Sequence, residues 1–249
     1  MVRVFQRPKS LYDVGFHYCP GCHHGIIHRL IAECIDDYRL RPKTIGVSSI
    51  GCSVLLYDYF DVDIMEAPHG RATAVATGIK RALPESFVFT YQGDGDLAGI
   101  GLGETLHTAN RGEKITVIFV NNTVFGMTGG QMAPTTMAGQ QTTTTPLGRA
   151  PGTEGYPIKM AELISSFAGT TFVARGSVHS PKHLMQAKKM IRGAFEAQIN
   201  HKGFGFVELL SACPTNWKMT PQEANQRIND ELIPCFPLGI FKEKACHVL

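Results

Sequence analysis

Residues 19–25 read CPGCHHG, with two cysteines separated by two residues and two histidines directly after them. Thiolates at this spacing can hold a metal or a cluster, can cycle between dithiol and disulfide, or can simply pack. A thioredoxin-like redox pair belongs to a βαβ context that this stretch does not show. A zinc site of four cysteines more often has two such pairs, and the sequence has one. The motif alone leaves these alternatives open.

A second group of polar residues, QGDGDLAG at 92–99, follows an apolar stretch. Glycines at a strand-to-helix turn let the backbone approach a phosphate, and a helix N-terminus favours negative charge. Gly93, Gly95 and Ala98 match the dinucleotide fingerprint GxGxxA, which is a weak pattern by itself. Two acidic residues among these glycines would repel a diphosphate, and a divalent cation between the anions removes that conflict.

The next apolar stretch, 115–120, ends in Asn121 and Asn122. Adjacent parallel strands bring their carboxyl ends together, so the Asn122 carboxamide can lie near Asp94. Mg²⁺ prefers oxygen ligands and combines one or two protein carboxylates with substrate phosphates. A carboxylate, an amide oxygen and a main-chain carbonyl just beyond would fill half an octahedron. The sequence therefore predicts a site for Mg²⁺ and a diphosphate.

GDGD at one strand end and NN at the next resemble the signature of thiamine diphosphate enzymes, although an ordinary glycine-rich turn is the alternative. The continuation NTVFGMTGGQ, residues 122–131, resembles the 2-oxoacid:ferredoxin oxidoreductase branch of that superfamily. The resemblance extends over roughly residues 15–215. It implies that Mg²⁺ is bound by Asp94, Asn122 and the Val124 carbonyl. It also implies contacts to thiamine diphosphate from Gly93, Asp94, Gly95, Asp96, Asn122, Gly126, Met127 and Thr128.

The same branch carries a 4Fe–4S cluster in its thiamine-binding β subunit. Its pattern CPGCGxG, a later GCS and a Cys-Pro near the end correspond here to Cys19, Cys22, Cys52 and Cys213. Four thiolates are what such a cluster requires. Cys52 and Cys213 each follow an apolar β-branched stretch, which places them on the side of the predicted diphosphate. His23 departs from the family, which usually has a small residue there.

Three other cysteines have no such assignment. Cys34 lies in a helical apolar pattern typical of a core, and Cys235 and Cys246 match no ligand position. The terminal CHVL is read as a chance match to a prenylation signal.

The residues HGR at 69–71 resemble a family motif at a helix start facing the cofactor, with a plain helix start as the alternative reading. The resemblance implies that His69 approaches the thiamine and is the candidate catalytic residue. It also places the segment Ile50, Gly51, Cys52 and Ser53 at the cofactor, with Ser53 at its diphosphate.

The implied reaction is oxidative decarboxylation: a 2-oxoacid, coenzyme A and oxidised ferredoxin give an acyl-CoA, CO₂ and reduced ferredoxin. Electrons would pass from thiamine diphosphate through the 4Fe–4S cluster to ferredoxin. The run TGGQMAPTTMAGQQTTTTPLGR, residues 128–149, resembles the 2-oxoisovalerate (branched-chain) enzymes, with 2-oxoglutarate or pyruvate as alternative substrates. A non-redox thiamine carboligase or decarboxylase would not need four thiolates, and a zinc- or nucleotide-binding module would bind no thiamine.

These residues must be positioned by a scaffold, which the hydrophobic pattern predicts. Apolar, β-branched stretches alternate with helical patterns, which predicts an α/β fold with a mainly parallel sheet and helices on both faces. By resemblance, this is the thiamine diphosphate-binding fold. The predicted strands are 43–48, 86–91, 115–120, 170–174 and 204–210, and the predicted helices are 23–37, 70–82, 97–110, 158–167 and 181–199.

The whole chain, 1–249, is predicted to be a single diphosphate-binding (PP-type) domain. Residues 121–157 are rich in Gly, Thr and Pro and fit neither a strand nor a helix. A loop of this length is usually functional or covered by a partner, and a floppy surface insertion is the alternative. From about residue 220 we expect a partner-docking C-terminal tail that begins as a helix and ends extended.

Composition limits the partners. The net charge is +3 without a basic tract, so nucleic acid is not expected. No apolar run approaches the roughly 20 residues that span a bilayer. The N-terminal MVRVFQRPKSLYD lacks the apolar segment of a signal peptide, which predicts a cytoplasmic protein with reduced thiols. The expected partners are an α subunit carrying the pyrimidine-binding half, small γ or δ ferredoxin-like subunits, ferredoxin and a small 2-oxoacid.

Overall fold

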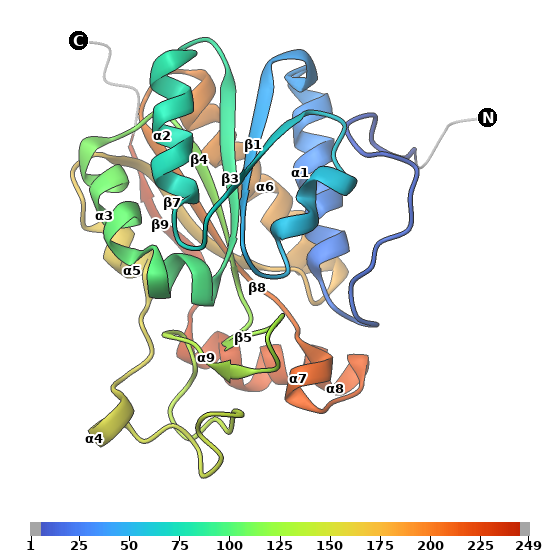
Figure 1. Cartoon of the computed structure of the whole chain (residues 1–249), viewed down its shortest axis with the longest axis vertical. Coiled ribbons are helices and arrows are strands. Elements are labelled where there is room, and N and C mark those ends of the chain that lie inside the picture. The colour runs from blue at the N-terminus through green and yellow to red at the C-terminus, as the bar shows by residue number, and fades with distance from the viewer. Residues whose placement is uncertain (1–5, 245–249) are drawn as a thin grey trace.

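Seven strands form one sheet in the computed structural model, which describes residues 6–244. Their order across the sheet is β2-β1-β3-β4-β8-β7-β9, and every neighbouring pair is parallel except β7 and β9. Figure 1 shows all the parallel strands ending at the same edge. The strands are β1 Thr44–Ser49, β2 Asp63–Ala67, β3 Phe87–Gly93, β4 Thr116–Asn121, β7 Thr170–Ser177, β8 Phe204–Leu210 and β9 Gly239–Glu243.

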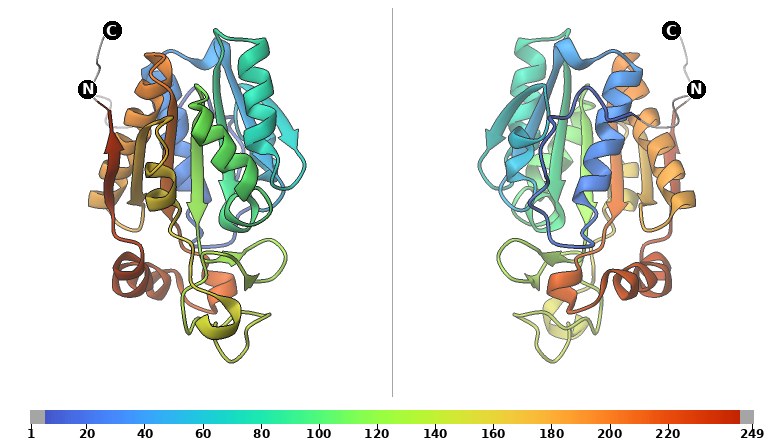
Figure 2. Two further views of the ribbon diagram at one scale, coloured as in Figure 1. Left: turned by 90° about the vertical axis from the view of Figure 1, so that its left-hand side faces the viewer. Right: turned by 90° about the vertical axis from the view of Figure 1, so that its right-hand side faces the viewer.

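Helices cover both faces of this sheet (Figure 2). On one face α1 (His24–Asp37) and α6 (Pro181–Ile199) enclose a core with alternate strand residues such as Phe89. On the other face, three helices enclose a second core with the intervening residues, such as Val88. These are α2 Ala72–Ala82, α3 Leu102–Arg111 and α5 Met160–Ser165. The expected α/β fold with a mainly parallel, doubly covered sheet is confirmed.

The structure differs from the sequence pattern at the two sheet edges and in one helix. β2 is mostly exposed, and β9 is short and pairs antiparallel with β7, so neither has the continuous apolar run of a central strand. Instead of one helix over 97–110, a π-helical segment η3 (Gly95–Ile100) precedes α3. Two short 3-10 turns, η1 Arg41–Lys43 and η2 Val54–Asp58, precede β1 and β2 in the chain.

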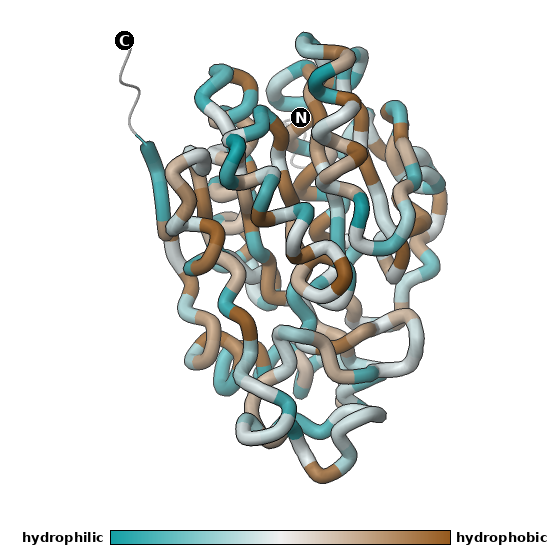
Figure 3. The backbone as a smooth tube through the Cα atoms, turned by 60° about the vertical axis from the view of Figure 1, so that its left-hand side comes forward, coloured by the Kyte–Doolittle hydropathy of each residue, from teal (hydrophilic) through white to brown (hydrophobic). Residues whose placement is uncertain are grey.

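A second, smaller layer lies beyond the carboxyl ends of the strands (Figures 1 and 2). Its core contains Trp217 from α7 and Ile228 from η4. The long loop is mostly pale in Figure 3, with few strongly hydrophobic positions. The layer contains the hairpin β5 Val124–Phe125 and β6 Gln131–Met132, then α4 Pro151–Glu154, and the C-terminal α7 Pro214–Trp217, α8 Pro221–Arg227, η4 Ile228–Leu232 and α9 Ile233–Cys235.

The C-terminal segment begins with helix α8, as the sequence predicts. Thr220 caps α8, and its hydroxyl and the Glu223 side chain bond reciprocally to the backbone. The segment then returns to the sheet as β9, and its role in docking a partner remains a prediction. Cys246 and the CHVL terminus lie outside the described residues. Within residues 6–244, no helix is long and apolar enough to cross a membrane.

One buried guanidinium organises the long loop. Arg149 is only 5% exposed and donates hydrogen bonds of 2.6–3.4 Å to six backbone carbonyls. Three of these carbonyls belong to 133–136 and three to 154–156, so Arg149 ties two parts of the loop together. Buried carbonyls need such donors in place of water, which explains how a loop with little regular structure is held in one conformation.

We predict that Arg149→Met opens this loop. Methionine fills a similar volume but donates no hydrogen bond, and leaving buried carbonyls unpaired costs about 1–3 kcal/mol each where water cannot reach them. The free energy of unfolding should fall by about 3 kcal/mol, and limited proteolysis should cut first within residues 137–148. The surface variant Lys182→Met should behave like the parent chain. Unchanged protease resistance of Arg149→Met would show that Arg149 does not hold the loop.

Candidate functional site

The candidate site is a cavity at the carboxyl ends of β1, β3 and β4, below the sheet edge. All the residues predicted to contact thiamine diphosphate line it, although their contact with a cofactor remains a prediction. Two residues that the sequence did not assign to the cofactor, His24 and Phe125, line it as well. The predicted residues that the structure brings together here are Ile50, Gly51, Cys52, Ser53, His69, Gly93, Asp94, Gly95, Asp96, Asn122, Val124, Gly126, Met127 and Thr128.

Size alone would not have selected this cavity, whose volume is about 90 Å³. A cavity of about 680 Å³ lies between the long loop and α7–α8, and one of about 500 Å³ lies between α6 and β9. Neither contains a predicted cofactor or cysteine position. We place the candidate site by its chemistry, because two buried carboxylates, an amide and the Cys52 thiol line the smaller cavity, and further thiols lie beside it.

Asp94 is the residue directly after β3, and it is almost completely buried. Its carboxylate accepts hydrogen bonds from Thr135 Oγ1 at 2.6 Å and from the Gly95 N–H at 2.8 Å. Burial raises the pKa of Asp94 from 3.8 to about 7, although these hydrogen bonds oppose the rise. A cation beside this carboxylate would favour its charged form, so the acid is suited to a divalent metal.

Asn122 directly follows β4 and lines the same cavity as Asp94. Its Oδ1 accepts a hydrogen bond from the Val124 N–H at 3.1 Å, and its backbone carbonyl accepts one from Trp217 Nε1 at 3.1 Å. Thr123 between them adopts a left-handed φ of 65°, an uncommon conformation for a β-branched residue. The turn is thus fixed from several directions, and the Asp, Asn and carbonyl oxygens form a donor set that fits Mg²⁺.

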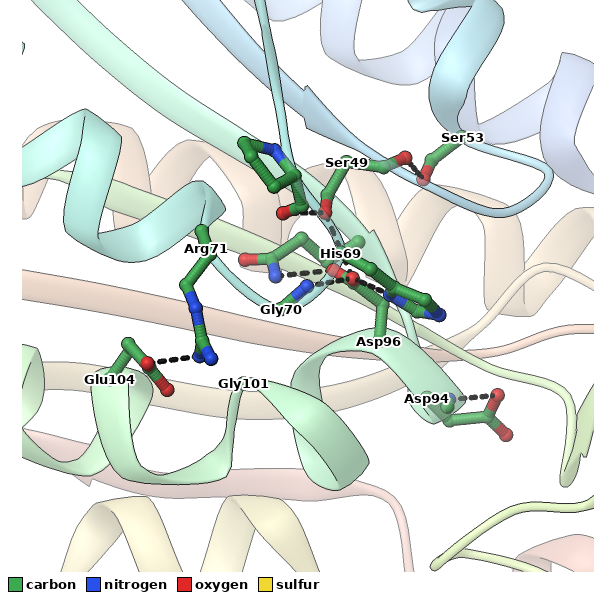
Figure 4. A network of polar contacts seen from close by, with 12 residues as sticks. Ser49, Ser53, His69, Gly70, Arg71, Asp94, Asp96, Gly101 and Glu104 are labelled. Atoms are coloured by element: carbon green, nitrogen blue, oxygen red, sulfur yellow. Dashed lines mark hydrogen bonds and ion pairs between the residues drawn. The ribbon is translucent and has the colours of Figure 1, made fainter.

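Asp96 holds the neighbouring helix start in place (Figure 4). Its Oδ1 accepts hydrogen bonds from Ser49 Oγ at 2.8 Å and from the Gly70 N–H at 2.5 Å, and it contacts His69 Nδ1. Gln92 Nε2 donates to the other oxygen at 2.6 Å. Both carboxylate oxygens are therefore occupied by this chain's own donors, and Asp96 orients the His69 ring at the cavity wall.

Packing requires the glycine at Gly95. A Cβ there would lie 2.3 Å from the Phe125 ring, which is far inside van der Waals contact. The sequence pattern attributed this glycine to the approach of a phosphate. In the structure it admits the phenyl ring of the β5 hairpin, which closes the same cavity.

The four cysteines of the predicted cluster gather beside this cavity. Burial raises the pKa of Cys52 to about 12, and the nearby thiols of Cys22, Cys213 and Cys19 raise it further. A Cβ at Gly126 would lie 3.4 Å from Cys52 Sγ and 3.8 Å from Cys213 Sγ. Gly126, in the loop that lines the cavity, therefore lies close to two of the four sulfurs.

The spacing of these thiols is not that of a single-ion site. Within residues 6–244, no group of three or more His, Cys, Asp or Glu side chains could hold a metal ion as placed. Four cysteine thiols in one region are the donor type that a 4Fe–4S cluster requires. The donor chemistry fits such a cluster.

N–H groups point at two of the sulfurs. The backbone amides of His23 and His24, at the start of α1, lie close enough to the Cys22 sulfur to lower its pKa. Burial nevertheless raises the pKa of Cys22 to about 11. Asn216 Nδ2 donates to Cys213 Sγ at 3.2 Å. Such donors favour the deprotonated, ligating form of a cysteine.

His23, the departure from the family pattern, connects the thiol motif to the C-terminal helices. Its Nδ1 accepts a hydrogen bond from the Ala212 N–H at 3.2 Å, and its Nε2 lies 2.9 Å from Asn225 Oδ1. Burial lowers its pKa to about 4, so the ring is neutral and Nε2–H donates to Asn225. The motif's Gly21 packs so tightly on Pro221 that a Cβ would lie 2.6 Å from the proline ring.

Sequence reasoning missed several residues of the site. His24 is buried, lines the cavity and lies 2.5 Å from the Tyr91 hydroxyl through its Nδ1, and burial lowers its pKa to about 3. Thr135, Asn216 and Trp217 bond to predicted site residues from the second layer. Only the SACPTNW context of Cys213 could have pointed to Asn216 and Trp217, and Thr135 is one of many threonines in its loop.

Comparison with known proteins shows which family this chain resembles. Residues 49–209 match the family described as thiamine pyrophosphate enzyme, C-terminal TPP binding domain. The chain is 35% identical to the 2-oxoglutarate synthase subunit KorB of Archaeoglobus fulgidus, over 92% of this chain and 85% of that protein. It superposes on a 2-oxoglutarate:ferredoxin oxidoreductase chain from Magnetococcus marinus with a TM-score of 0.78 and 26% identity, covering 97% and 86% of the two chains.

A further relative is longer than this chain. The ketoisovalerate oxidoreductase subunit VorA of Methanothermobacter thermautotrophicus is 46% identical over 98% of this chain. The match covers 54% of VorA, so the chain spans about half the length of that relative.

The raised pKa of Asp94 gives a pH-dependent prediction. A carboxyl whose pKa is higher in the folded chain destabilises the fold as it ionises, so this loss begins above about pH 4 and is complete above about pH 7. Asparagine cannot ionise, so Asp94→Asn without added metal should be more stable than the parent at pH 8, by on the order of 3 kcal/mol. The difference should vanish near pH 4. Thermal unfolding in a chelating buffer tests this, and a difference independent of pH would contradict it.

Proposed function

This chain belongs to the thiamine pyrophosphate-binding subunits of the 2-oxoacid:ferredoxin oxidoreductase family, and from that membership we propose that it catalyses oxidative decarboxylation as one subunit of a larger enzyme. The products would be an acyl-CoA, CO₂ and reduced ferredoxin. The observation that carries this proposal is the meeting of two motifs at one sheet edge. Asp94 and Asn122 share the cavity with Cys52, and Cys22 and Cys213 lie close enough to shift the pKa of Cys52.

Thiamine diphosphate, when bound, supplies the group that cleaves the bond between the carboxyl and carbonyl carbons of a 2-oxoacid and holds the resulting electron pair. The chain's part is to bind and orient it. Asp94, Asn122 and the Val124 carbonyl would hold Mg²⁺ against the diphosphate. The Gly126–Thr128 loop and Ser53 line the same space, and Asp96 keeps the His69 ring at its wall.

A 4Fe–4S cluster on Cys19, Cys22, Cys52 and Cys213 would accept electrons one at a time beside the cofactor. Burial keeps the pKa values of Cys22, Cys52 and Cys213 above their ordinary range, so these thiols carry protons until iron replaces them. A non-redox thiamine enzyme would have no use for this costly grouping of buried thiols. This favours the oxidoreductase over a carboligase or decarboxylase.

The small size of the cavity supports the proposal of a partner subunit. Its volume of about 90 Å³ is below the roughly 300–1,000 Å³ of complete small-molecule sites, so this chain alone does not form the whole site. Ile50 and Met127 line it and are also 38% and 47% exposed. These features suit a cavity whose second wall comes from another surface. We infer that an α subunit with the pyrimidine-binding half supplies that wall and most of the acid pocket. Ferredoxin-like subunits and ferredoxin would accept electrons, in the cytoplasm.

Two substrates are favoured by specific observations. The 46% identity to a ketoisovalerate oxidoreductase subunit favours 2-oxoisovalerate. The 35% identity to a 2-oxoglutarate synthase subunit and the structural match to an enzyme with 2-oxoglutarate and coenzyme A bound support 2-oxoglutarate as the second candidate. Pyruvate remains a further alternative. Reduction of ferredoxin by the anaerobically purified complex, with each acid in turn, distinguishes them through kcat/KM.

The cluster assignment predicts about four irons and four sulfides for each copy of this chain, beyond any that ferredoxin-like subunits of that complex hold. Cys213→Ser should lose or degrade the cluster, because a serine hydroxyl is a harder and more basic ligand than a thiolate, and 2-oxoacid-dependent ferredoxin reduction should fall at least 100-fold. Cys235→Ser, a half-buried cysteine outside the group, should keep iron and activity. Zinc in place of iron, or an iron-free parent enzyme after anaerobic handling, would remove the redox half of the proposal.

The cation site predicts a separate result. Asp94→Asn removes the only carboxylate of the proposed Mg²⁺ set, so Mg²⁺-dependent binding of thiamine diphosphate should weaken by at least 100-fold while the iron content stays unchanged. Calorimetric titration of the purified complex with the cofactor, with and without Mg²⁺, measures this. Asp63→Asn, on the exposed edge strand, is the matched control. Undiminished affinity in Asp94→Asn would refute the Mg²⁺ assignment.

A further inference from the structure

Asn216 lies in the second layer, three residues after Cys213, and its side chain points back to the site. Its Nδ2 donates one hydrogen bond to the Gly126 carbonyl at 2.8 Å and a second to Cys213 Sγ at 3.2 Å. One amide group therefore connects a proposed cluster ligand to the loop that lines the cofactor cavity. Within residues 6–244, it is the only side chain that donates to a sulfur of the four-cysteine group.

The orientation of this amide follows from its partners. A backbone carbonyl can only accept a hydrogen bond, so the amide group 2.8 Å from the Gly126 oxygen must be the NH₂ group. The flipped orientation would place the amide oxygen against both the carbonyl and the sulfur, which repel it. The two N–H groups of one nitrogen diverge, and each has one acceptor here.

The side chain has little room to turn away. A Cβ at Gly130 would lie 3.1 Å from Asn216 Cβ, so the loop backbone packs directly against it. The next residue, Trp217, anchors α7 through its hydrogen bond to the Asn122 carbonyl. Gly130 and Asn122 both lie in the segment after β4 that lines the candidate cavity or packs against α7. Their contacts keep the Asn216 amide fixed relative to Cys213.

We propose that Asn216 tunes the reduction potential of the metal cluster through its hydrogen bond to the Cys213 sulfur, an inference that rests on the proposed function. An N–H group directed at a ligating sulfur stabilises negative charge there, and the reduced cluster carries one more negative charge than the oxidised one. The bond therefore raises the potential and makes the cluster a better electron acceptor beside the cofactor. Asn216 acts through Cys213 and is a positioning residue, not a catalytic one.

The test is Asn216→Leu in the anaerobically purified complex. Leucine has nearly the same shape but donates no hydrogen bond. Redox titration followed by electron paramagnetic resonance of the reduced cluster should show a more negative potential. We expect about a tenfold change in the ratio of reduced to oxidised cluster at a fixed potential, equal to about 59 mV for one electron. Asn229→Leu makes the same change on the exposed surface of η4 and should leave the potential unchanged.

A second measurement needs no variant. With asparagine side chains labelled with ¹⁵N, the reduced parent enzyme should show a nitrogen hyperfine coupling to the cluster. Asn216→Leu should lose that coupling if it assembles a cluster. Absence of the coupling in the parent enzyme would overturn the proposal even if the variant fails to fold.

The remaining outcomes separate this inference from the proposed function. Four irons per chain, with equal potentials for the parent and Asn216→Leu, would overturn the role of Asn216 and leave the proposed function standing. An iron-free parent enzyme would overturn both. A shift shared by Asn229→Leu would show a general effect of the second layer, which also contradicts a specific role for this hydrogen bond.

Discussion

Four adjacent parallel strands, β1, β3, β4 and β8, end at the same edge of the sheet, and the candidate site depends on this constraint. The residues that follow them are Cys52, Asp94, Asn122 and Cys213, which lie far apart in the sequence. Because parallel strands are separated by covering helices, no local segment could bring these groups together. The strand ends are rigid, being buried on both faces, and so fix the directions from which the polar groups enter the cavity.

The second layer supplies what the strand ends lack. Strands end without partners for their last polar groups, and the loop and helix α7 provide them: Thr135 for Asp94 and Trp217 for the Asn122 carbonyl. The buried Arg149 keeps that loop in one conformation. The same layer leaves Asp94 and the cysteines with perturbed pKa values, so the fold carries an electrostatic cost that bound cations would offset.

The sequence was most informative where the chemistry repeats a pattern. Continuous β-branched runs predicted the central strands, because strands buried on both faces must be apolar throughout. The polar residues directly after those runs then predicted which groups would meet. The edge strands β2 and β9 were missed because half of each faces outward. Arg149, Thr135 and Asn216 were missed because their hydrogen bonds go to backbone carbonyls, a carboxylate and a sulfur that come together only in the folded chain, and no local period marks such contacts.

The contact between the CPGCHHG motif and α8 has a consequence for biosynthesis. Cys213 is translated about 190 residues after Cys19 and Cys22, and Gly21 and His23 pack on residues translated later still. At about 5–20 residues per second, the first two thiols wait roughly 10–40 s for the others. Any cofactor that needs all four must be inserted after Cys213 has been translated, so the nascent polypeptide carries an incomplete set of thiol ligands throughout that interval.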